Sequence, residues 1–294
     1  MRTQLRGPLG SLPRWALAIL VLAALALIYW GIGGAIMSDT DADLSQRPSA
    51  EMLPPGGSVT VATLSTSTLS ELDRGGWTPN ATMLKPTGLL EEMPSFQRGV
   101  YALWAPTAGA LAALSGGDEL TEAAELLSTR PGRGFLHAEF PFIGGSAGSR
   151  YRDAVTALDA ANAEFAAVGD RPFATAASAR ALVGAIGGQL TSAVRTLDRR
   201  IMAADAEPTE DALSYQEIRG LAYASTLLLR GIQADHDDVL RQRELSPDMV
   251  EAIEAFDRVA STDPWSVDDG DRTEQAYILR AGVAALARLR SGLA

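Results

Sequence analysis

The chain has 294 residues, with 36 acidic and 25 basic side chains, two His and no Cys, and its net charge at pH 7 is −11. The absence of Cys excludes disulfides and thiolate metal sites. The acidic balance argues against nucleic acid as a partner, because such a surface repels phosphate backbones.

The first predicted element is a transmembrane helix over residues 15–37, which contain no charged side chain. A helix of this length spans the roughly 30 Å hydrocarbon core of a bilayer. Three Arg precede it and three Asp follow it, so we expect residues 1–14 in the cytoplasm and the body in the periplasm. A cleaved signal peptide is the alternative, although the apolar run exceeds the roughly 7–15 residues of a signal core.

Residues 38–58 are predicted to be a flexible linker, because Asp, Ser, Pro and Gly dominate them. Asp39, Asp41 and Asp43 alternate like the start of a calcium-binding loop. Leu44 and Ala50 stand where that loop needs Gly and Glu, so we expect a solvated segment and no calcium site.

Residues 59–294 are predicted to form an all-α periplasmic domain, a helical bundle with long irregular loops. Residues 59–72 fit either a short strand followed by a helix or one helix throughout. A helix opening at Pro94 should be kinked or divided at Pro106. The remaining predicted helices cover residues 119–127, a segment from 151 onward, 175–203, 211–243, a segment from 247 onward, and 273–289. A join between two domains, if there is one, lies at residues 128–149.

Apolar side chains recur at helical spacing along these segments. In the segment from 151 onward the stripe consists of Tyr151, Val155, Leu158, Asn162 and Phe165. Asn162 either fixes the register of this helix or lies at the edge of its stripe. In the segment from 247 onward, Val250, Ile253 and Phe256 are predicted to face inward.

One motif fits a hydrolase. Residues 144–148 read Gly-Gly-Ser-Ala-Gly, which matches the G-x-S-x-G nucleophile elbow. The elbow also needs a sheet and a downstream His, and the single candidate, His236, lies in a helical segment. We therefore predict that Ser146 or Ser149 caps the following helix. A phosphate cradle with Arg150 and Arg152 nearby is a weaker alternative, since no Walker A motif is present.

Other clusters of titratable residues carry no predicted site. Residues 235–238 read Asp-His-Asp-Asp, but neighbours on a helix diverge by about 100° and cannot share one metal ion. We expect a solvated face there, with an ion pair between Asp237 and Arg241. Residues 268–271 lack the Glu of a calcium loop, and His137 lies in an aromatic loop. The Glu pairs at 91–92, 122–125 and 251–254 receive no role. Catalytic, cofactor-binding and metal residues are therefore all predicted as none.

Several short segments occur in a recognisable order: residues 75–80, 93–99, 151–158, 222–240, Trp265 and the closing helix with Arg280. Together with the N-terminal anchor they resemble the bacterial domain of unknown function (DUF) 2333 family. The resemblance implies a proteobacterial inner-membrane protein with one span, and it supplies no catalytic residues. The chain departs from the family at residues 144–148 and at His236.

These observations favour an interaction or scaffolding module of the cell envelope over an enzyme. The expected partner is the membrane together with an envelope protein or a second copy of the chain. An envelope hydrolase is one alternative. A periplasmic ligand-binding protein is another, with Trp77, Trp104 and Trp265 lining a pocket; if these rings pack against the helices instead, they belong to the core.

Overall fold

The computed structural model describes residues 13–37, 40, 42–74, 76–80, 92–133, 145–169, 173–202, 213–262 and 266–294. Within these ranges the secondary structure is helical and contains no strand, which confirms the all-α prediction. The helices are α1 (Arg14–Met37), α2 (Val59–Asp73), α3 (Glu92–Ser115), α4 (Asp118–Leu127), α5 (Ala147–Val168), α6 (Ala176–Met202), α7 (Tyr215–Asp235), α8 (Asp237–Gln242), α9 (Ser246–Ser261) and α10 (Asp269–Gly292).

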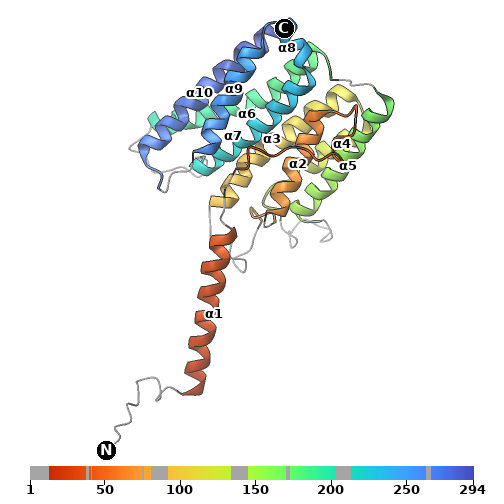
Figure 1. Cartoon of the computed structure of the whole chain (residues 1–294). Coiled ribbons are helices and arrows are strands. Elements are labelled where there is room, and N and C mark those ends of the chain that lie inside the picture. Colours follow the sequence, from red (N-terminus) through yellow and green to blue (C-terminus); the bar gives the residue numbers. More distant parts are fainter. Residues whose placement is uncertain are drawn as a thin grey trace, which may run out of the picture.

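Helix α7 lies at the centre of the bundle, and every residue from Ile218 to Leu229 is buried. It packs against α2 and α3 on one side and against α9 on the other, while α10 packs on α9 and α6 (Figure 1). A helix that is buried on all sides must be surrounded by other helices, as α7 is. The described helices after α1 therefore form one continuous bundle.

The contact between α3 and α7 depends on two glycines. A Cβ atom placed on Gly99 would lie 1.9 Å from the Glu217 carbonyl oxygen, and one on Gly220 would lie 2.0 Å from that of Phe96. Any larger residue at either position would push the two backbones apart. The glycines thus fix how closely the central helix approaches its main neighbour.

Helix α1 forms where the transmembrane helix was predicted, and it projects away from the bundle (Figure 1). Its described side chains cover residues 15–29 and 31. Among the described residues, we find no helix that is both long enough and apolar enough to cross a membrane. The membrane span over residues 15–37 therefore stays a prediction.

Two ambiguities of the sequence are resolved near the start of the body. Residues 59–72 belong to one helix, α2, whose first turn is capped by the Ser58 side chain accepting a hydrogen bond from the Val61 N–H. Helix α3 runs through Pro106 without being divided. Trp104, Ala108 and Leu111 are fully buried around this proline, and their packing holds both halves of the helix in place.

The single helix predicted over 211–243 is instead divided at His236, where φ is −120° and ψ is 19°. The buried imidazole lies 2.9 Å from the Ile232 carbonyl oxygen through Nδ1 and 3.2 Å from Ser178 Oγ through Nε2. The contact with Ser178 comes from α6, so a tertiary interaction accompanies the break. Periodicity along one segment does not reveal such an interaction.

The inward face predicted for the helix after Pro247 is correct in two of three positions. Ile253 and Phe256 are buried, but Val250 is 42% exposed and Met249 is fully buried instead. The prediction for Val250 is therefore wrong. Met249, Ile253 and Phe256 recur at spacings of four and three, which places them on one face, and Val250 lies about 100° away from Met249 around the helix.

Candidate functional site

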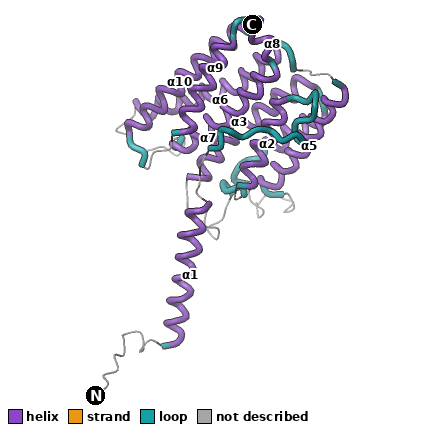
Figure 2. Tube along the Cα trace, in the orientation of Figure 1, coloured by secondary structure: helices purple, strands orange, loops and turns teal. Residues whose placement is uncertain are grey.

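The described part of the predicted linker is a packed segment, which we call the strap (residues 40 and 42–58). It leads from α1 to α2 and crosses the face of the bundle as an irregular loop (Figure 2). Thr40 is buried, and Ala42 and Leu44 pack against the hydrophobic core. In its described residues the strap thus differs from the flexible linker predicted over 38–58, because distant helices provide partners for its polar groups.

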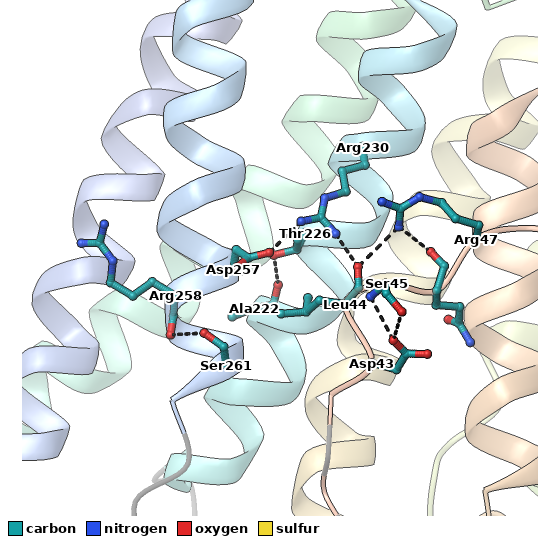
Figure 3. Close-up of polar contacts among 11 residues, drawn as sticks. Asp43, Leu44, Ser45, Arg47, Ala222, Thr226, Arg230, Asp257, Arg258 and Ser261 are labelled. Atoms are coloured by element: carbon teal, nitrogen blue, oxygen red, sulfur yellow. Dashed lines mark hydrogen bonds and ion pairs between the residues drawn. The ribbon is translucent and has the colours of Figure 1, made fainter.

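Arg230 of α7 joins the strap to α9 (Figure 3). Its Nη1 donates a hydrogen bond of 2.6 Å to the Leu44 carbonyl oxygen, and its Nη2 lies 2.7 Å from Asp257 Oδ1. On the strap itself, Asp43 accepts hydrogen bonds from the backbone N–H and the hydroxyl of Ser45. The Ser45 hydroxyl is the main reason why the pKa of Asp43 is lowered. One guanidinium therefore connects three separate parts of the chain.

Arg219, three turns before Arg230 on the same face of α7, is a buried cation that reaches the start of the strap. Its Nη1 donates to Thr40 Oγ1 over 3.1 Å and to Gln216 Oε1 over 2.7 Å, and its Nε donates to the Ala260 carbonyl oxygen over 3.3 Å. The guanidinium carbon lies 6.0 Å from the centre of the Phe96 ring. A buried charge is costly unless hydrogen bonds and ring contacts replace its hydration, as they do here.

The other end of the strap is held by Asn162 of α5. Its Oδ1 accepts a hydrogen bond of 2.6 Å from the Ser58 N–H, and its Nδ2 donates one of 2.8 Å to the Met52 carbonyl oxygen. Asn162 is fully buried. Asn162 thus lies within the buried stripe of α5 and not at its edge, and its side chain holds the strap to that helix.

Asp235, at the end of α7, caps the beginning of α2. Its carboxylate accepts hydrogen bonds from Ser58 Oγ at 2.7 Å, from the Val59 N–H at 2.8 Å and from the Thr60 N–H at 2.9 Å. The first N–H groups of a helix have no partner within the helix, and a negative charge there is favourable. This carboxylate therefore stabilises α2 and ties the end of the strap to the central helix.

A buried polar cluster lies between α2, α3, α7 and the strap. Glu71 is completely buried, and its carboxylate oxygens have no hydrogen-bond partner within the described residues, although Arg74 lies 3.7 Å away. Burial raises the pKa of Glu71, and Arg74 opposes this only in part. Burial, and then the nearby Glu71, also raise the pKa of Tyr223, whose hydroxyl donates to Gln46 Oε1 of the strap over 3.4 Å. Burial thus lets both side chains beneath the strap keep their protons to a higher pH than they would in water.

The Ser of the G-x-S-x-G motif caps a helix. Ser146 Oγ accepts a hydrogen bond of 3.3 Å from the Ser149 N–H at the first turn of α5, as the capping hypothesis predicted. Gly144 lies outside the described residues. His236 contacts Ser178, and the described residues contain no strand on which an elbow could be built. Arg152, considered for a phosphate cradle, lies 2.9 Å from Asp73.

The acidic clusters serve structural roles. Asp237 and Asp238 lie 3.0 and 2.5 Å from Arg241, which confirms the predicted ion pair. Asp268 and Asp271 form a capping box at the start of α10. In the part of the chain that the structure describes, no three His, Asp or Glu side chains come together to hold a metal ion. His137 and Glu91 lie outside the described residues.

The tryptophans that we considered for a ligand pocket lie in the core where they are described. Trp77 is 5% exposed and Trp104 is fully buried, and their ring centroids are 5.6 Å apart. The Trp77 indole donates to the Pro131 carbonyl oxygen over 2.8 Å, and that of Trp104 donates to Ser67 Oγ over 3.2 Å. Trp265 lies outside the described residues.

No family model matches this chain, and neither a curated protein nor a solved structure matches it. The resemblance to the DUF2333 family therefore stays a prediction. Sequence reasoning did not single out Arg219, Arg230 or Glu71. It placed residues 235–238 on a solvated face, which is wrong for Asp235, whose carboxylate caps α2, and for His236, which is buried. Charged residues inside the apolar stretch of α7 were a signal for the two arginines, since a buried charge requires partners.

Proposed function

We propose that the protein is a single-span membrane protein of the bacterial inner membrane, with α1 in the bilayer, the N-terminus in the cytoplasm and the helical body in the periplasm. The body acts as an interaction or scaffolding module of the cell envelope. Its partner is another envelope protein, which the body holds at a set position relative to the membrane.

The surface of α1 supports the anchor. Ten large apolar or aromatic side chains of this helix are at least half exposed: Trp15, Leu17, Ile19, Leu20, Val21, Leu22, Leu25, Leu27, Ile28 and Tyr29. They lie on all sides of the helix, whereas a surface helix has one apolar face. Moving them from water into lipid contributes on the order of 10 kcal/mol, at about 1 kcal/mol for each half-exposed side chain. The uncharged stretch continues to Met37 in the sequence.

The sign of the flanking charges supports the orientation. Arg2, Arg6 and Arg14 lie before the apolar stretch, and no acidic residue does. The first acidic residues of the chain, Asp39 and Asp41, follow it directly. Positive flanks remain on the cytoplasmic side of a first span, so the body is exported.

The strap is the observation that carries the scaffold role. Thr40, which is buried against the bundle, comes three positions after Met37, the last residue of α1, and three Cα–Cα steps span at most about 11 Å. Arg219, Arg230 and Asn162 then hold the strap to the bundle. A body held in this way stays close to its anchor, as a scaffold at the membrane surface requires.

The test is cross-linking in intact cells, followed by affinity purification of the full-length protein from detergent-solubilised membranes. We expect a distinct envelope protein in near-stoichiometric yield. The matched sample is the Arg230→Ala, Asn162→Ala variant, in which the strap is released while α1 is unchanged; we expect it to stay in the membrane fraction and to lose most of the partner. Recovery of the protein alone, or only with copies of itself, would contradict the scaffold role.

A further inference from the structure

A second feature of the surface is an open cavity of about 650 Å³ between α6, the end of α8 and the end of α10. Three arginines line it: Arg180 of α6, Arg290 of α10, and Arg243, which directly follows α8. The rest of its described lining consists of Ala, Gly and Leu and contains no acidic side chain. In a chain with 36 acidic and 25 basic residues, such a concentration of positive charge is unexpected.

Arg243 is held in place by the backbone of the last turn of α10. Its Nη1 donates hydrogen bonds of 2.9 Å to the carbonyl oxygen of Gly292 and to the backbone oxygen of Ala294, the last residue of the given sequence. A guanidinium has five N–H donors, and these two contacts use one nitrogen. The next residue, Glu244, has a φ of 58°, in the left-handed region that non-glycine residues rarely adopt. The turn that presents Arg243 is thus built at a cost in backbone strain.

Arg180 of α6 and Arg290 of α10 both line the cavity. The Nε and Cζ atoms of Arg290 lie 3.4 and 3.7 Å from the position of a Cβ atom on Gly184, so the guanidinium lies over a residue without a side chain. Arg180 lies one turn before Gly184, on the same face of α6. Neither Arg180 nor Arg290 makes a hydrogen bond or an ion pair within the described residues. By contrast, each of several other arginines lies within ion-pair distance of an acidic side chain: Arg74, Arg152, Arg230, Arg241, Arg280 and Arg288.

We propose that this cavity binds a small, soluble anion with more than one negative charge, of the phosphate or phosphate-ester class. Guanidinium groups bind phosphate oxygens through paired, charge-assisted hydrogen bonds. The volume lies in the range of small-molecule sites, about 300–1,000 Å³.

The choice of a soluble anion over a lipid headgroup rests on the proposed membrane anchor. Figure 1 places α8 and the C-terminal end of the chain at the end of the bundle opposite α1. A cavity in this position faces away from a bilayer that contains α1. Anion binding itself does not depend on the anchor, so the two proposals can fail separately.

The test is calorimetric titration of the full-length protein in detergent with inorganic pyrophosphate and with inorganic phosphate at low ionic strength. We expect saturable binding that is tighter for pyrophosphate. The Arg180→Gln, Arg290→Gln variant should bind at least about tenfold more weakly, because each lost charge-assisted contact contributes on the order of one tenfold factor. Ala181→Glu, which places an acid in the exposed lining, should have a similar effect.

The control is Arg195→Gln, which removes an exposed arginine from the same helix outside the lining and should leave the affinity unchanged. The proposal is wrong if no binding occurs, if the Arg180→Gln, Arg290→Gln variant binds as the wild type does, or if Arg195→Gln weakens binding equally.

Titration in phosphatidylcholine nanodiscs with and without phosphatidylglycerol distinguishes the source of the anion. Unchanged pyrophosphate affinity supports a soluble ligand, and competition by phosphatidylglycerol would overturn that assignment in favour of a headgroup.

Discussion

Replacing Asn162 by Ala should destabilise the protein strongly and release the strap. The substitution removes the acceptor of the Ser58 N–H, and Ser58 is 2% exposed. A buried N–H without a partner costs about 1–3 kcal/mol. It also removes the donor to the Met52 carbonyl, which is only partly buried, for about 1 kcal/mol more. We therefore expect the free energy of unfolding to fall by about 2–4 kcal/mol, a large share of the roughly 5–15 kcal/mol of a typical domain.

Two assays measure this effect on the full-length protein in detergent micelles. Urea unfolding gives the change in free energy, and digestion with a glutamyl endopeptidase reports the strap, because exposed Glu51 directly precedes Met52. We expect Asn162→Ala to accelerate cleavage after Glu51. Thr156→Ala, on the exposed face of the same helix, should change the unfolding free energy by less than about 0.5 kcal/mol. A loss below about 0.5 kcal/mol in Asn162→Ala, or unchanged cleavage, would refute the account of the strap.

Three further predictions follow from the packing. Asp235→Ala should lower the free energy of unfolding, measured by urea titration, by about 2–4 kcal/mol, because three hydrogen bonds to the start of α2 are lost. An effect below about 0.5 kcal/mol would show that water replaces these hydrogen bonds. Gly99→Ala should cost more than about 3 kcal/mol by the same measurement, because its Cβ would meet the Glu217 backbone. At Gly109 an added Cβ atom would meet nothing within 4 Å, so Gly109→Ala should instead stabilise α3 by about 0.5–1 kcal/mol. Equal effects of Gly99→Ala and Gly109→Ala would contradict the close contact between α3 and α7. Because burial raises the pKa of Glu71 above 4.5, its contribution to stability is present below that pH and is lost as pH rises through the folded-state pKa. Thermal unfolding should therefore show Glu71→Gln gaining stability relative to wild type as pH rises above about 4.5, and a difference that does not change with pH would contradict the raised pKa.

The strap is the part of the structure that could not be predicted from the sequence. Its Asp, Ser, Pro and Gly content is typical of a flexible linker, and nothing within it indicates burial. Its partners lie far along the chain: Asn162 is 110 residues from Met52, and Arg230 is 186 residues from Leu44. Contacts over such separations become visible only when the helices are packed.

The helices themselves were largely predictable, because apolar residues at helical spacing mark a buried face. The predictions fail where a tertiary contact ends a helix, or where a small rotation of a helix changes which of its residues are buried. The break at His236 accompanies a contact with Ser178 of another helix, and Val250 is exposed because the buried face of α9 is centred on Met249 and Phe256. The role of Ser146 was predictable because capping needs only local residues.

The most direct test of a membrane-anchored, exported body uses single cysteines, since the chain has none of its own. Thr3→Cys marks the N-terminal segment and Ser291→Cys marks the exposed end of α10. A membrane-impermeant maleimide is applied to spheroplasts before and after permeabilisation. The account predicts immediate labelling at 291, labelling at 3 only after permeabilisation, and recovery of both proteins in carbonate-washed membranes. Labelling of 291 only after permeabilisation, or release of the protein by carbonate, would contradict it.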